Sequence, residues 1–90
     1  MIYYRYIISK INGILHTWDP IGFTPKDEYE DLSLKIFNRL KENESQEKLT
    51  LFIENYLQEV VGLSEINKSD LRGNVFKILQ EYNDFMKREN

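Results

Sequence analysis

Apolar residues recur along most of the chain at spacings of three and four positions, which is the period of an α-helix. The first such segment, roughly residues 2–18, is apolar around most of its circumference, and its polar side chains fall on one narrow stripe at Arg5, Ser9, Asn12 and His16. A helix of this kind is buried on several sides. We therefore expect it to be the central helix of the fold or part of an interface with another chain.

Short breaks separate this segment from the next helix. Asp19-Pro20 ends the first helix, because the residue before a proline is pushed away from the helical region. Thr24 then serves as the N-cap of the second helix, with Pro25 at its first position, and that helix runs to about Asn43.

The other boundaries carry similar signals. Ser45 is the expected N-cap of a third helix, whose apolar stripe runs to Val60 and which Gly62 closes in a left-handed conformation. Asn67 or Ser69 caps a fourth helix that runs to about residue 87.

Four helices and no strand-like alternation predict an all-α fold. Ninety residues and 10.9 kDa leave room for one domain. We therefore expect a single-domain four-helix bundle over residues 1–90, with a largely buried N-terminal helix.

Composition removes most chemistry. The chain has no cysteine and one histidine, which excludes disulfides, thiolate catalysis and cysteine-type zinc sites. A net charge of −3 has the wrong sign for a general nucleic-acid binder, and no apolar run is long enough to span a membrane. The N-terminus lacks the features of a signal peptide, so we expect a cytoplasmic protein without cofactor or metal.

The string Trp18-Asp19-Pro20-Ile21-Gly22, followed by Asp27-Glu28-Tyr29, resembles the motif of a family of small uncharacterised bacterial helical proteins. The resemblance implies a bacterial source and a small helical fold. It implies no activity, and it assigns no catalytic residue to this chain.

The same segment holds the residues that we expect to contact a partner. Trp18 is a residue type enriched at binding hot spots, and the carboxylates around it form a negative patch suited to a basic protein. The alternative is structural, with Trp18 anchored in the core, Asp19 capping the second helix and the acidic residues decorating a helix start. The predicted partner-binding residues are Trp18, Asp19, Asp27, Glu28, Glu30 and Asp31.

These features favour a non-catalytic bacterial protein that binds another protein. Its most concrete form is an immunity-type inhibitor of a basic toxin or enzyme, by analogy with other small acidic helical bundles. The alternative is a structural, homodimeric protein in which the first helix buries its surplus apolar surface against a second copy. An enzyme would need a pocket that holds His16 with two carboxylates.

Overall fold

The computed structural model describes residues 4–20 and 26–89, the side chains of residues 26–28 and 89 excepted. Within these ranges every regular element is helical, which confirms the prediction of an all-α helical bundle. None of these helices has the length and apolar content needed to cross a lipid bilayer. The elements are α1 (Tyr4–Trp18), α2 (Lys26–Lys41), α3 (Gln46–Asn55), its π-helical continuation η1 (Tyr56–Val61) and α4 (Lys68–Glu89).

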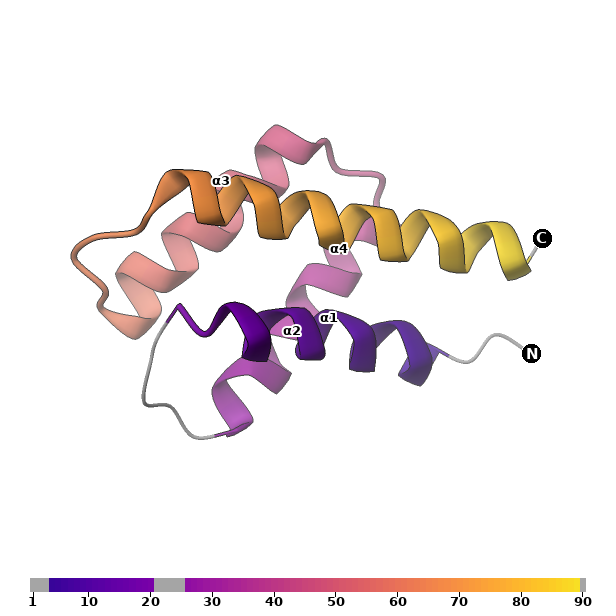
Figure 1. Cartoon of the computed structure of the whole chain (residues 1–90), viewed down its shortest axis with the longest axis horizontal. Helices are drawn as coiled ribbons and strands as arrows, with labels where there is room; N and C mark the ends of the chain where they lie inside the picture. The colour runs from indigo at the N-terminus through magenta and orange to yellow at the C-terminus, as the bar shows by residue number, and fades with distance from the viewer. Residues whose placement is uncertain (1–3, 21–25, 90) are drawn as a thin grey trace.

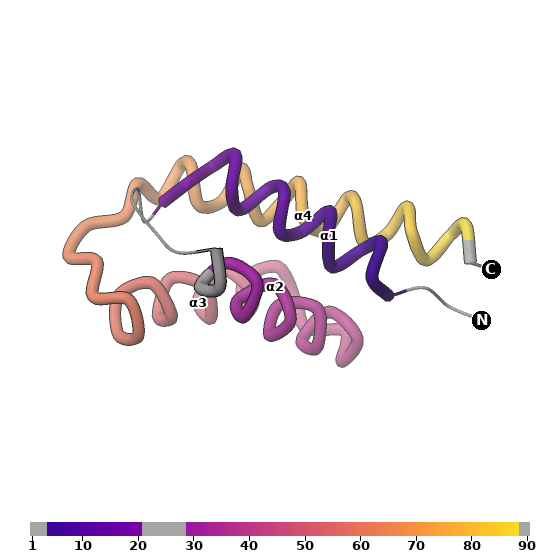
Figure 2. The backbone as a smooth tube through the Cα atoms, turned by 90° about the horizontal axis from the view of Figure 1, so that it is seen from below, coloured from indigo at the N-terminus to yellow at the C-terminus, as the bar shows by residue number. Residues whose placement is uncertain are grey.

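The helices form two layers. α1 and α4 lie side by side and run in opposite directions, so that their free ends are at the same end of the molecule (Figure 1). α2 and α3 form the second layer beneath them (Figure 2). α1 contacts α2, and α4 contacts α3, so the apolar faces of all the helices meet between the layers.

The predicted ends of the third helix are confirmed. The Ser45 side chain accepts a hydrogen bond from the Lys48 backbone N–H at 3.2 Å, as an N-cap does. Gly62 closes the segment with φ at 93°, in the region where only glycine is unstrained.

Asn67, and not Ser69, caps the fourth helix, because its side-chain oxygen accepts a hydrogen bond from the Asp70 backbone N–H at 3.0 Å. The predicted cap of the second helix, Thr24 with Pro25, lies outside the described residues.

Among the described residues, sixteen apolar ones make up the core, and every helix contributes to it. Val60 was expected on the core stripe, but 65% of its surface is exposed. The cause is η1, since a π-helix winds more loosely than an α-helix and shifts the register of the residues that follow. Tyr56 and Leu57 still face the core and Val60 turns outward. The core residues are Ile7, Ile11, Leu15, Tyr29, Leu32, Ile36, Phe37, Leu40, Leu49, Ile53, Tyr56, Leu57, Leu71, Val75, Ile78 and Phe85.

The prediction of a largely buried N-terminal helix is not confirmed in the single chain. α1 buries Ile7, Ile11 and Leu15, whereas Tyr4 and Tyr6 are 41% and 44% exposed. Among the described elements, α1 packs mainly against α2 and α4, and part of its surface remains exposed. The exposed residues of α1 are Tyr4, Arg5, Tyr6, Ser9, Lys10, Gly13, His16 and Thr17.

Candidate functional site

Asp19 ends α1 in a left-handed conformation, with φ at 50° and its backbone N–H donating to the Leu15 carbonyl at 2.7 Å. Aspartate tolerates this conformation better than most residues do. The Tyr29 hydroxyl donates a hydrogen bond to Oδ1 of Asp19 at 3.0 Å, which ties the end of α1 to α2. The side chain of Asp19 thus links α1 to α2, although the residue is exposed to solvent.

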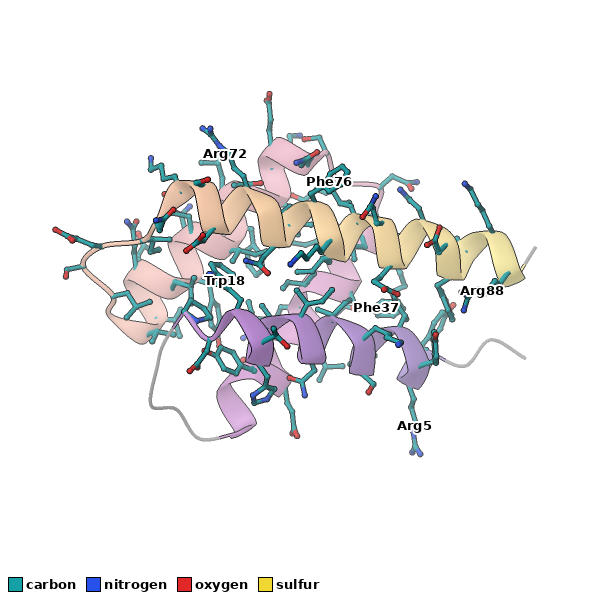
Figure 3. The ribbon with its side chains drawn as sticks, in the orientation of Figure 1. Arg5, Trp18, Phe37, Arg72, Phe76 and Arg88 are labelled. Atoms are coloured by element: carbon teal, nitrogen blue, oxygen red, sulfur yellow. The ribbon has the colours of Figure 1, made fainter. Side chains whose placement is uncertain are left out.

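A cleft of about 200 Å³ opens at this end of α1, between the end of the helix and the connection that leads into α4. Trp18 lies here at the C-terminal end of α1 (Figure 3), half-buried and packed against the core. We call this feature the corner cleft. Its lining residues are Trp18, Asp19, Pro20, Leu63, Glu65, Ile66, Asn67 and Asp70.

The corner cleft is lined by both apolar and acidic side chains, and polar atoms make up the larger part of its surface. Asp19, Glu65 and Asp70 are all exposed, and no lysine or arginine is among the lining residues. Among the described residues no group of three acidic or histidine side chains is arranged to hold a metal ion. The cleft therefore offers carboxylates to a ligand without gathering them around one point.

The structure separates the predicted acidic residues. Asp31 accepts hydrogen bonds from Lys35 at 2.7 Å and from the Tyr56 hydroxyl at 3.2 Å, so its charge is paired within the chain. Glu30 lines a different groove, between α1 and α2. The side chains of Asp27 and Glu28 lie outside the described set.

Trp18 and Asp19 are therefore joined by residues that the sequence did not single out. Glu65 and Asp70 lie more than forty positions away from Asp19 along the chain, and only the return of the chain into α4 brings them to the same cleft. A local signal existed for Asp70 alone, since it stands three residues after the cap Asn67, where acidic residues are common.

His16 lies on the exposed side of α1, and its ring meets the edge of the Tyr29 ring at a centroid distance of 4.8 Å. Tyr29 in turn contacts Asp19, because its hydroxyl donates a hydrogen bond to that carboxylate. His16 and Asp19, three residues apart in the sequence, are therefore connected through the side chain of Tyr29.

The pairing of Asp31 with Lys35 predicts that part of the stability of the fold depends on pH. The pKa of Asp31 lies below its ordinary value of 3.8, chiefly because Lys35 donates a hydrogen bond to the carboxylate. Some loss of hydration opposes this shift, whereas the Lys35 charge and the Tyr56 hydroxyl add to it. A pKa lowered by folding stabilises the folded state at pH values above the unfolded pKa, and this stability is lost as the pH falls through the folded pKa.

We therefore expect Asp31→Asn to lower the midpoint of urea unfolding slightly at neutral pH, and the difference from the wild type to shrink below pH 3.8. Asp84→Asn, at an exposed carboxylate of α4, is the matched control for the loss of one negative charge. A difference for Asp31→Asn that stays constant down to the acid limit would contradict the pairing.

The resemblance to the W-D-P-I-G family rests on the first third of the chain, and the described part of that motif forms the end of α1. Trp18 packs against the core there, and Asp19 accepts a hydrogen bond from Tyr29 of α2. No protein-family model matches the chain, and comparisons with curated proteins and with solved structures gave no significant match.

Proposed function

We propose that this protein is a non-catalytic bacterial protein of the cytoplasm that binds a basic protein through the corner cleft. The observation that carries the proposal is the lining of that cleft, where apolar side chains of Trp18, Leu63 and Ile66 lie beside the carboxylates of Asp19, Glu65 and Asp70. No lysine or arginine is among these lining residues. A lysine or arginine side chain of a partner is complementary to both the apolar and the acidic side chains of the cleft. Its aliphatic stem packs on apolar surface, and its charged end meets the carboxylates.

Trp18 supports the same partner chemistry. An indole ring attracts a cation placed over its face more strongly than the other aromatic rings do. Because Trp18 is half-buried against the core, its ring is held in place before a partner arrives. A pre-positioned ring spends little conformational entropy on binding.

The most concrete form of the proposal is an immunity-type inhibitor of a basic toxin or enzyme. The net charge of −3 favours the approach of a basic protein, and the acidic start of α2, with Asp27 and Glu28, adds to the field. The apolar content of α1 predicts a largely buried helix, whereas part of α1 is exposed in the single chain. In this proposal a second protein chain would cover more of that surface.

The test is affinity capture from a lysate of the encoding bacterium on immobilised protein. Glu65→Lys/Asp70→Lys reverses two carboxylates of the cleft, and Glu42→Lys/Glu59→Lys changes the net charge equally at exposed positions elsewhere. We expect the wild type and the Glu42/Glu59 control to retain the same basic protein and the cleft variant to lose it. Retention of the same proteins by both variants, or of no protein by the wild type, overturns the proposal.

The complex then offers a direct readout of where the partner binds. Trp18 is the only tryptophan of the chain, so a shift in its fluorescence emission reports occupation of the corner cleft. We expect this shift with the purified partner, and we expect added salt to weaken it because the contact is charged. An unchanged emission spectrum at saturation places the partner elsewhere.

A further inference from the structure

A second surface, on the seam between α1 and α2, has a different character from the corner cleft. It is a groove of about 550 Å³, with an apolar centre and charged ends. We propose that this groove is the interface of a two-fold symmetric homodimer. Its lining residues are Arg5, Ile8, Ser9 and Asn12 of α1 and Glu30 and Leu34 of α2.

The contacts between the two helices give the order of residues along the groove. Tyr4 packs on Phe37 with ring centroids 4.9 Å apart, and His16 meets Tyr29 at 4.8 Å. The start of α1 therefore lies beside the later part of α2, and the end of α1 lies beside the start of α2. This antiparallel register sets Arg5 and Glu30 toward opposite ends of the groove.

A hydrogen bond between the helices agrees with this register. The Ser33 hydroxyl donates to the Asn12 side-chain oxygen at 3.4 Å, which places Asn12 beside the stretch that begins with Glu30. Arg5 is seven residues before Asn12, about 10 Å along the helix axis at 1.5 Å per residue. Leu34, one turn after Glu30, lies between the two charges.

Both charges are available to another molecule. Arg5 and Glu30 are exposed, and neither forms an ion pair with the described residues of the chain. Figure 3 shows the Arg5 side chain pointing away from the bundle. Leu34 is 49% exposed although it is a large apolar residue.

An apolar centre between one positive and one negative end is complementary to itself. A second copy turned by half a turn about an axis through Leu34 places its Glu30 against Arg5, and its Arg5 against Glu30, as the isologous contact of a two-fold dimer requires. The two apolar centres then meet and leave water. The basic partner proposed for the corner cleft does not fit here, because Arg5 repels it.

The affinity of this dimer is limited by the small apolar area of the groove, compared with the area that a stable interface buries. A standard interface buries roughly 800 Å² on each partner, which is about an eighth of the 6104 Å² that the chain exposes. Ile8 and Leu34 are the apolar residues among the six that line the groove. We therefore expect a reversible dimer whose population rises with protein concentration.

Sedimentation equilibrium of the full chain over a concentration series tests this inference. The wild type is expected to shift from 10.9 kDa toward twice that mass as the concentration rises. Arg5→Glu alone and Glu30→Arg alone each set like charges together at both contacts, so each variant is expected to remain monomeric. Arg5 and Glu30 are both exposed, and replacing either breaks no ion pair among the described residues. We therefore expect circular dichroism to show the same helix content as in the wild type.

The decisive sample is an equimolar mixture of the two variants. Pairing Arg5→Glu with Glu30→Arg restores opposite charges at both contacts, so the mixture is expected to dimerise although neither variant does so alone. Arg72→Glu and Glu59→Lys, exposed positions on α4 and η1, are the matched controls and should keep the mass of the wild type. A wild type that stays at 10.9 kDa, variants that dimerise alone, or a mixture that stays monomeric each overturns the proposed interface.

Discussion

Replacing Tyr29 with alanine is expected to lower the free energy of unfolding by about 3–5 kcal/mol, the range for removal of a buried aromatic ring. Tyr29 is fully buried near the start of α2, and among the described residues it is the largest of the fully buried side chains. Its ring contacts His16 and its hydroxyl holds Asp19, so the side chain joins α2 to the end of α1. A chain of 90 residues has a total stability of roughly 5–14 kcal/mol at ordinary values per residue, so the loss is a large share of it.

Tyr29→Phe separates the two contributions of this residue. The phenylalanine keeps the ring in the core and removes the hydrogen bond to Asp19, whose exposed carboxylate can then bind water. We expect a cost of about 1 kcal/mol. Urea unfolding followed by far-ultraviolet circular dichroism measures both variants, and an alanine variant as stable as the phenylalanine one would falsify the core role of the ring.

Ile11→Ala is expected to cost about 2–5 kcal/mol, because truncating a buried isoleucine loses apolar burial and leaves a cavity. Ile11 is fully buried in the middle of α1, the helix that contacts both α2 and α4. The cavity would therefore lie where the two layers meet. The loss should appear as a lower urea midpoint at an unchanged slope, since the surface exposed on unfolding is nearly the same.

Two further variants serve as controls for Ile11→Ala, one with a smaller truncation at the same position and one at an exposed position. Ile11→Val removes one methylene and should cost about 0.5–1.5 kcal/mol. Leu51→Ala, at a position 57% exposed on α3, should change stability by no more than about 0.5 kcal/mol. Equal losses for Ile11→Ala and Leu51→Ala would contradict the burial of α1 on this side.

The parts of the fold that depend on neighbours in sequence were predictable. Ser45 and Asn67 cap helices because their side-chain oxygens reach N–H groups three residues on, and Gly62 closes a helix because it lacks a Cβ. Each of these effects acts within one turn of chain. The buried residues of α2 recur at spacings of three and four positions, and such local spacing predicts which side of a helix is buried.

The register of η1 and the exposure of α1 were not predictable in this way. Val60 continues the apolar spacing of α3, yet a single π-helical turn directs it outward. The apolar content of α1 indicated burial on several sides, but how many sides are covered depends on how many helices pack against it. The number of packed neighbours is a property of the whole tertiary arrangement, and the sequence of the helix alone does not specify it.

At the candidate site, the pattern of residues predicts that Trp18 and Asp19 stand at the end of a helix and that an acidic stretch follows, because helix ends and charges are local properties. The tertiary structure decided which carboxylates share a surface. It brought Glu65 and Asp70 to the corner cleft, paired Asp31 with Lys35 and placed Glu30 in the groove with Arg5. The physical reason is that contacts between distant segments arise from the packing of two helical layers, and no local pattern of residues specifies which exposed side chains that packing brings together.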